Sequence, residues 1–305
     1  MNRSIVQQNL AGPQYDAWLG YLSGEYSRKG TASQTVPAWV KRINTIEKHE
    51  VIATALEELT QGLERLFGEK PITVLSGIDL EGKQASHDPG IWIGTWAGNS
   101  LLAEAFSESE RAAVQGEGFV IREDEELARL FIGAETPQGV LYGTFHLLRE
   151  LVLAQGSSSE ADTSPKKWSH VIEQPRNALR MINQWDNVDG SIERGYAGKS
   201  IFYENGEFTQ DIVRIRDYAR LLASAGINAI SINNVNVHQR ETLFLTERFL
   251  SDVARVASAF RAYGIRLYLS ANYASPMEIG GLLTADPLDE QVREWWNIQT
   301  AKVYA

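Results

Sequence analysis

A dense set of polar, charged and aromatic side chains lies between residues 183 and 202, in the stretch NQWDNVDGSIERGYAGKSIF. Its chemically versatile members are Trp185, Asp186, Asn187, Asp189, Glu193, Arg194, Tyr196 and Lys199. These types suit a charged sugar, because Trp offers a stacking face, Asn and Asp bond hydroxyl groups, and Arg or Lys pairs with a carboxylate. The same composition fits a loop that folds on itself through an Asp189-Gly190 turn and an Arg194 ion pair, so residue types leave both interpretations open.

Two more polar stretches follow predicted strands. Residues 233–238 read NNVNVH, and Asn is depleted in strands, so this run indicates hydrogen bonding either to a ligand or to neighbouring loops. Residues 270–278 read SANYASPME, and Asn272 and Tyr273 are candidates to face a pocket. Position alone makes Glu278 a candidate catalytic carboxylate, but we interpret it as a surface residue. No spacing of His, Asp and Glu predicts a metal site, and neither a nucleophile elbow nor a phosphate loop is present.

The elements that must position these stretches alternate in type. Short apolar strands are predicted at residues 178–182, 227–232 and 265–269, and amphipathic helices at 211–225, 246–263 and 288–304. Such alternation implies parallel strands joined by crossover helices. The loops after the strands are long and polar, while Gly226 and Gly264 alone follow the first two helices. That asymmetry favours the first three units of a (β/α)8 barrel, whose active site is built from the loops after the strands.

A doubly wound open sheet is the competing fold. It usually carries a glycine-rich phosphate loop after its first strand. Here Gly190, Gly195 and Gly198 have a different spacing and bulky residues between them. The barrel is therefore the preferred prediction for residues 178–305.

The preceding residues predict a smaller α/β domain. A long amphipathic helix spans 47–67, short strands are predicted at 72–75, 91–96, 119–121 and 127–132, and Thr136-Pro137 opens a second helix with Thr136 as its N-cap. Residues 156–167 read GSSSEADTSPKK, a composition typical of an exposed linker. We therefore predict an N-terminal α/β sandwich over 1–155, a linker that leads into the barrel over 156–177, and the barrel part over 178–305.

Composition narrows the function classes. The 305 residues carry a net charge of −10, which argues against a nucleic-acid partner but not against a local cluster of Arg and Lys that binds an anion. The chain has no cysteine, so disulfides and thiolate metal sites are excluded. Residues 1–10 do not resemble a signal peptide, and no apolar run is long enough to span a membrane. We expect a cytoplasmic protein.

Three long segments resemble the α-glucuronidases of glycoside hydrolase family 67. They are RMINQWDNVDGSIERGYAGKSIF, LLASAGINAISINNVNV and LSANYASPMEIGGLLTADPLD, each at a predicted strand end. A weaker resemblance extends through ETPQGVLYGTFHLLRE and EGFVIRED into the N-terminal region. The resemblance implies an N-terminal α/β domain, a (β/α)8 barrel and a helical C-terminal domain. It also implies cofactor-free, inverting cleavage of the α-1,2 bond between (4-O-methyl)glucuronic acid and the terminal xylose of a xylo-oligosaccharide.

The resemblance further implies how the site is divided along the barrel. An inverting enzyme needs an acid and a base about 6.5–9.5 Å apart, and the family takes them from the fourth and later strands. We assign neither role to Glu193, Glu278 or Asp286, and we expect the 305-residue chain to lack the pair and to be inactive alone. The substrate-binding positions that the resemblance implies are Trp185, Asp186, Asn187, Glu193, Arg194, Asn234, Asn236 and Val237.

Partners follow from the same resemblance. The expected substrates are glucuronic-acid-substituted xylo-oligosaccharides. We expect neither a nucleic acid nor a membrane as a partner, and we expect the full-length enzyme to form a homodimer. A non-catalytic sugar-binding module is the alternative, and a sugar hydrolase of different specificity on the same plan is a third interpretation.

Overall fold

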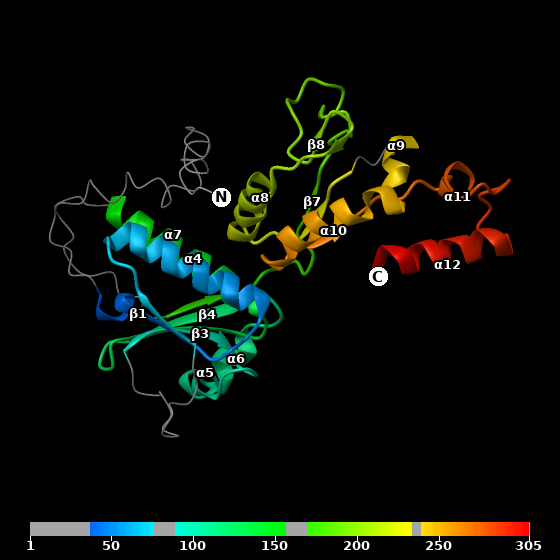
Figure 1. Cartoon of the computed structure of the whole chain (residues 1–305). Coiled ribbons are helices and arrows are strands. Elements are labelled where there is room, and N and C mark those ends of the chain that lie inside the picture. The colour runs from blue at the N-terminus through cyan, green and yellow to red at the C-terminus, as the bar shows by residue number, and fades with distance from the viewer. Residues whose placement is uncertain (1–36, 76–88, 157–169, 234–238, 305) are drawn as a thin grey trace. The chain divides into compact units, whose positions relative to one another are not determined.

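The computed structural model describes residues 37–75, 89–156, 170–233 and 239–304 (Figure 1). The chain divides into two compact units, Met1–Ala178 and Leu179–Ala305. Both are mixed α/β structures with parallel strands. The mixed α/β class of both units and the parallel strands of the second agree with the sequence prediction.

The first unit is built on a six-stranded sheet in the order β2-β1-β3-β5-β4-β6. Its strands β2, β1, β3 and β5 run parallel, whereas β4 pairs antiparallel with both β5 and β6. In chain order the elements are η2 (Ala38–Lys41), β1 (Arg42–Thr45), α4 (Glu50–Phe67), β2 (Ile72–Leu75), β3 (Gly90–Thr95), α5 (Ser100–Ala105), α6 (Glu108–Ala113), β4 (Phe119–Asp124), β5 (Arg129–Ala134), α7 (Pro137–Gly156) and β6 (Val171–Glu173).

Helices α4 and α7 lie side by side over one face of this sheet (Figure 1). The apolar residues of α4 recur every three or four positions, so one face of the helix is buried, and Gly68 ends the helix in the left-handed conformation at φ 80°. The two helices approach closely at Gly62, where a Cβ atom would lie 2.5 Å from Leu148. Thr136 accepts a hydrogen bond from the Gly139 N–H at 3.3 Å, which confirms it as the N-cap of α7.

The opposite face of the sheet has its own apolar core beneath α5 and α6. Its buried members are Trp92, Leu102, Phe106, Val114, Val120 and Phe131. The Phe106 ring meets Trp96 and Phe131 edge to face, with centroids 5.3 and 6.2 Å apart. Burial on both faces explains why β3 carries the apolar run Ile91, Trp92 and Ile93 rather than an alternating pattern.

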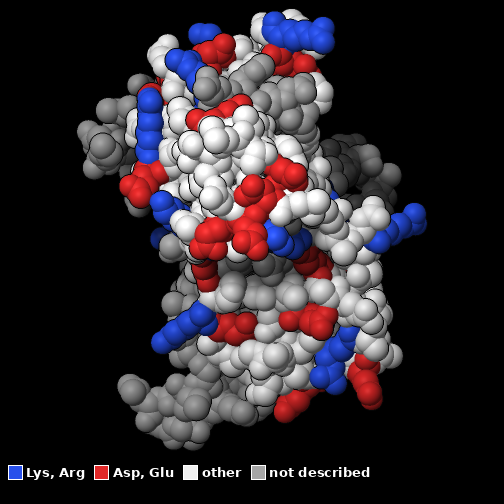
Figure 2. Space-filling view, turned by 90° about the vertical axis from the view of Figure 1, so that its right-hand side faces the viewer, with Lys and Arg blue, Asp and Glu red and all other residues white. Residues whose placement is uncertain are grey.

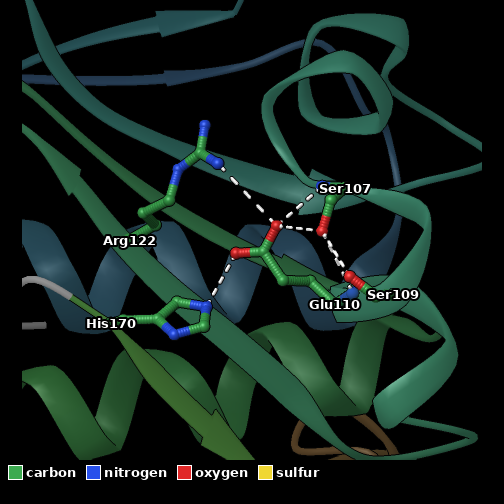
Figure 3. A network of polar contacts seen from close by, with 5 residues as sticks. All are labelled: Ser107, Ser109, Glu110, Arg122 and His170. Carbon is green, nitrogen blue, oxygen red and sulfur yellow. Dashed lines mark hydrogen bonds and ion pairs between the residues drawn. The ribbon is translucent and has the colours of Figure 1, made fainter.

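A polar network fastens α6 to the sheet (Figure 3). The Glu110 carboxylate accepts hydrogen bonds from the backbone N–H and the hydroxyl of Ser107, both at 2.7 Å, and so closes the capping box of α6. His170 Nε2 lies 2.7 Å from the other carboxylate oxygen, Oε1, whereas Arg122 Nη1 of β4 lies 3.8 Å from Oε2, the oxygen that Ser107 bonds. Burial raises the pKa of Glu110, but these hydrogen bonds and the Arg122 charge outweigh it, so the pKa is lowered.

The network includes a residue from the stretch predicted as a linker. His170 directly precedes β6, which pairs with β4 through Ile121 and Val171. The sequence does not predict this strand, because its three residues are all at least partly exposed and show no apolar alternation. Part of the predicted linker thus belongs to the sheet of the first unit.

The second unit contains a three-stranded parallel sheet in the order β11-β10-β7. Its elements are β7 (Met181–Asn183), β8 (Tyr203–Glu204), β9 (Glu207–Phe208), α8 (Ile212–Ser224), β10 (Ala229–Ser231), α9 (Gln239–Thr242), η3 (Leu243–Leu245), α10 (Glu247–Arg261), β11 (Arg266–Tyr268), α11 (Ser275–Glu278) and α12 (Glu290–Tyr304). The predicted alternation of strands and helices is present. Closure of the sheet into a barrel stays a prediction.

A glycine comes shortly after the end of each of the helices α8 and α10, as the sequence predicts. Gly226 and Gly264 adopt left-handed conformations, at φ 76° and 70°, directly after the turns that end α8 and α10. These short returns bring each helix back to the next parallel strand. The long loops that carry the polar stretches therefore all leave from the carboxyl ends of β7, β10 and β11, and we call them the strand-end loops. The first strand-end loop follows β7, the second follows β10 and the third follows β11.

Candidate functional site

The strand-end loops are tied to one another at the edge of the sheet. The Gln184 N–H donates to the Ser231 carbonyl at 2.9 Å, which links the first loop to β10. The buried Tyr203 hydroxyl, at the far end of that loop, donates to the Ile232 carbonyl at 2.7 Å. Both ends of the first loop are thus fixed to the strand that carries the second.

Asn233 joins the second loop to the third. Its side-chain amide donates to the Ser270 carbonyl at 2.8 Å and accepts from the Ser270 N–H at 2.7 Å. The residue is fully buried. Of the two roles left open for this asparagine run, Asn233 therefore bonds a neighbouring loop. Asn234, Asn236 and Val237 lie outside the described residues.

The first strand-end loop folds on itself around Asp186. Its carboxylate accepts from the Ser200 hydroxyl at 2.5 Å and from the Ile201 N–H at 3.3 Å. The Ser200 N–H donates to the Gly190 carbonyl at 2.8 Å, and the Ser200 hydroxyl accepts from the Tyr203 N–H at 3.0 Å. A carboxylate only 2% exposed thus closes the loop from within.

Asn187 and Asp189 act in the same way. The Asn187 amide donates to the Ser191 hydroxyl at 2.9 Å and to the Glu193 carbonyl at 2.8 Å. Asp189 accepts from the backbone N–H and the hydroxyl of Ser191, at 2.8 and 2.6 Å. These bonds lower the pKa of Asp189. The predicted self-folding of the loop is therefore present, but through Asp186, Asn187 and Asp189 and without an Arg194 ion pair among the described residues.

Other side chains of this loop face outward. Trp185 is 37% exposed, and Arg194 and Lys199 are exposed. The backbone of Glu193 is left-handed, with φ 56°, and its N–H donates to the Trp185 carbonyl at 3.0 Å. That bond places the backbone of Glu193 and Arg194 beside Trp185. Of the predicted site residues that the structure describes, Trp185 and Arg194 are exposed and Glu193 is half-buried.

Burial governs the electrostatics behind the loop. Burial raises the pKa of Asp186, and the hydrogen bonds from Ser200 and Ile201 offset this only in part. Burial and the nearby Asp186 charge raise the pKa of Tyr218 to about 12. Gln184, which donates a hydrogen bond to the Tyr218 hydroxyl, works in the opposite direction. Both tyrosines of this region, Tyr203 and Tyr218, therefore remain neutral hydrogen-bonding groups at neutral pH.

An aromatic cluster supports the loop from below. The Tyr203 ring stacks on Phe244 at 5.5 Å and meets Phe208 edge to face at 5.0 Å. Phe249 packs against Phe244 at 5.5 Å. The β8–β9 hairpin that carries Tyr203 and Phe208 turns at Asn205 and Gly206, with φ 55° and 86°. Sequence reasoning missed this hairpin, although Asn-Gly between apolar residues is its usual signal.

A small hollow lies beside the hairpin. Its volume is about 100 Å³, well below the ~300 Å³ of the smallest typical ligand pockets. The lining residues are Val188, Asn205, Gly206, Glu207, Arg240, Leu243, Arg248 and Phe249. This hollow alone is too small to enclose a sugar.

The third strand-end loop is held by Glu278. The Asn272 amide donates to both carboxylate oxygens of Glu278 at 3.1 Å, and the Thr242 hydroxyl donates to one of them at 2.9 Å. Glu278 is exposed, as predicted, but it also links α9 to the loop after β11. No local sequence pattern predicts the hydrogen bond between Thr242 and Glu278, because the two residues are 36 positions apart in the chain.

Several other kinds of site find no support in the described part of the chain. No group of three or more His, Cys, Asp or Glu side chains is placed to hold a metal ion there. Among the described helices, none combines the length and the apolar character needed to cross a membrane. Figure 2 shows Lys and Arg scattered among carboxylates on the face in view, rather than joined in one basic surface.

Comparisons with known proteins cover both units. Residues 17–147 match the profile of the glycosyl hydrolase family 67 N-terminus, and residues 160–305 match that of the glycosyl hydrolase family 67 middle domain. Alpha-glucuronidase A of Emericella nidulans is 37% identical over 313 residues, covering 99% of this chain and 33% of that protein. Probable alpha-glucuronidase A of Neosartorya fischeri is 35% identical over 290 residues, covering 95% and 31%. The chain therefore spans about a third of the length of these relatives.

Solved structures share the fold. A family GH115 4-O-methyl-α-glucuronidase with specificity for decorated arabinogalactans superposes with a TM-score of 0.54 at 18% identity, covering 85% of this chain and 33% of that one. A GH138 enzyme that targets pectin rhamnogalacturonan II gives a TM-score of 0.50 at 13% identity, covering 86% and 29%. At these identities the likeness concerns the fold alone.

Proposed function

The chain belongs to glycosyl hydrolase family 67, and from this premise we propose that it serves the removal of (4-O-methyl)glucuronic acid from xylo-oligosaccharides. The observation that carries the proposal is the match of both units to this family, with relatives named alpha-glucuronidase over nearly the whole chain. The reaction is hydrolysis of the α-1,2 bond to the terminal xylose with inversion. No cofactor takes part in the proposed reaction.

In this proposal the first strand-end loop binds the uronic acid. The Trp185 ring stacks on the sugar, because aromatic faces pack against the C–H surfaces of pyranose rings. The Arg194 guanidinium pairs with the sugar carboxylate in a charge-assisted, two-pronged hydrogen bond. Glu193 bonds a hydroxyl group beside them. Asn234, Asn236 and Val237 are proposed to line the wall of the same pocket.

Asp186 and Asn187 have an indirect role in this scheme. Their oxygen and nitrogen atoms are engaged inside the loop, with Ser200, Ile201 and Ser191. They fix the backbone of the loop that carries Trp185. Such supporting bonds keep a binding site in shape before the ligand binds.

The acid and the base are proposed to lie outside these 305 residues. Inverting hydrolysis needs two carboxyl groups about 6.5–9.5 Å apart, with room for a water molecule. The Glu278 carboxylate accepts hydrogen bonds from Thr242 and Asn272. The Asp286 carboxylate accepts a hydrogen bond from the Leu288 N–H at 2.9 Å. Both carboxylates are thus engaged in hydrogen bonds within the chain, and neither is proposed as the acid or the base. The chain by itself is thus a sugar-binding part of the proposed enzyme.

Trp185→Ala tests the binding role. We expect the variant to bind a xylo-oligosaccharide that carries one 4-O-methylglucuronic acid about tenfold more weakly, as loss of one stacking contact predicts. Trp185→Phe is the matched variant, because it keeps an aromatic face, and it should retain most of the affinity. Isothermal titration measures both. Equal affinity of Trp185→Ala and the unaltered chain would remove Trp185 from the site.

The same preparation tests the division of labour. Incubation with the decorated oligosaccharide should release no glucuronic acid, because the proposed acid and base are missing. Release at a rate above the uncatalysed background would place catalytic carboxylates within this chain and overturn that part of the proposal.

A further inference from the structure

The outward tip of the first strand-end loop carries an aromatic side chain with no partner in the described structure. Tyr196 is 76% exposed. In the sequence it lies between two cationic residues, Arg194 and Lys199, which are also exposed. Within residues 37–75, 89–156, 170–233 and 239–304, none of the three side chains makes a hydrogen bond, ion pair or ring contact. The tip therefore differs from the rest of the loop, whose polar side chains bond one another.

The backbone under this tip is well defined. Gly195 and Gly198 flank the turn in left-handed conformations, at φ 89° and 103°. A Cβ atom at either position would meet nothing within 4 Å, so it is the backbone angle and not space that requires glycine. An isolated bridge between Ser191 and Lys199 closes the turn at its base. Tyr196 therefore lies on a turn that a backbone bridge closes at its base.

A tyrosine in this setting suits a sugar ring. Its side chain has only two rotatable bonds, so ordering it on binding costs little entropy, and it offers both an apolar face and a hydroxyl group. The Glu193 N–H bond to the Trp185 carbonyl, at 3.0 Å, anchors the turn next to the residue proposed to stack on the uronic acid. One loop thus carries two exposed aromatic rings, Trp185 and Tyr196.

We propose that Tyr196 determines specificity for the xylose part of the substrate, with its ring packed on a xylose unit while Trp185 packs on the uronic acid. The inference rests on the proposed function and deepens it. Arg194 and Lys199, which are exposed in the same turn, favour an oligosaccharide that carries a carboxylate over a neutral one. Tyr196 is a binding residue in this scheme and takes no part in proton transfer.

The test compares Tyr196→Ala with Tyr196→Phe and with Tyr304→Ala in the full chain. Tyr304 is 86% exposed at the end of α12, so its replacement is a matched loss of an exposed tyrosine outside the strand-end loops. The probes are a xylo-oligosaccharide with one 4-O-methylglucuronic acid, and free glucuronic acid. Isothermal titration gives the affinities, and thermal melts check that exposed-residue changes leave the fold intact.

Tyr196→Ala should weaken binding of the decorated oligosaccharide about three- to tenfold and leave free glucuronic acid unaffected, whereas Tyr196→Phe and Tyr304→Ala should bind as the unaltered chain does. Unchanged affinity of Tyr196→Ala for the oligosaccharide, together with a loss in Trp185→Ala, would overturn this inference and leave the proposed function standing. Equal losses for both probes would place Tyr196 on the uronic acid and overturn the assignment to xylose. Failure of the unaltered chain to bind either probe would overturn the proposed function itself.

Discussion

Replacing Asn233 by Ala removes the clamp between the second and third strand-end loops. Two hydrogen bonds to Ser270 are lost, and each contributes about 1 kcal/mol net. The Ser270 N–H and carbonyl then lack their partner, which costs more where water cannot reach them. Because Ser270 is only partly buried, water replaces part of the loss. We therefore expect the free energy of unfolding of the second unit to fall by about 2 kcal/mol.

Amide hydrogen exchange reads this loss at the residue concerned. A change of about 2 kcal/mol corresponds to roughly 30-fold faster exchange, and the Ser270 amide, now bonded to Asn233, should show it first. Amides of β3 in the first unit serve as an internal reference. Asn297→Ala is the matched control, since Asn297 is exposed on α12 and its loss should change stability by less than ~0.5 kcal/mol. Equal exchange at Ser270 in Asn233→Ala and the control would refute the clamp.

Three further changes probe the units separately. Folding raises the pKa of Asp186, so the second unit should gain stability relative to Asp186→Asn as the pH falls from 7 toward 4; a constant difference in melting temperature across that range would contradict this. Folding lowers the pKa of Glu110, so the first unit should lose stability below about pH 4 faster than Glu110→Gln does, and parallel melting curves would argue against it. Gly133→Ala places a Cβ atom 2.3 Å from Trp96, so the free energy of unfolding measured in urea should fall by about 1–3 kcal/mol. An unchanged free energy of unfolding would show that the core adjusts to the added methyl group.

Much of the fold follows from local signals in the sequence. The apolar spacing of α4 and the glycines that follow α8 and α10 are read within a few residues, and so is the Thr136 cap of α7. Strand β6 escapes such reading because it has three partly exposed residues and depends on pairing with β4. Its pairing is a tertiary effect that no local pattern records.

The candidate site divides in the same way. Residue types between 183 and 202 single out one loop as the candidate site, but they do not separate inward from outward side chains. Asp186 is a buried acceptor for Ser200, fourteen residues away, whereas Trp185 beside it is open to ligand. Neighbours in sequence thus have opposite environments, because Asp186 is buried through hydrogen bonds to Ser200 and Ile201, partners that no local pattern identifies.

Hydrogen exchange of residues 184–202 with and without sugar tests the proposed site most directly. A xylo-oligosaccharide that carries one 4-O-methylglucuronic acid should slow exchange in this loop of the unaltered chain, and the undecorated oligosaccharide should slow it far less. Trp185→Ala should abolish most of the protection at the same sugar concentration. Protection confined to other parts of the chain, or none with either sugar, would contradict a uronic-acid site on the first strand-end loop.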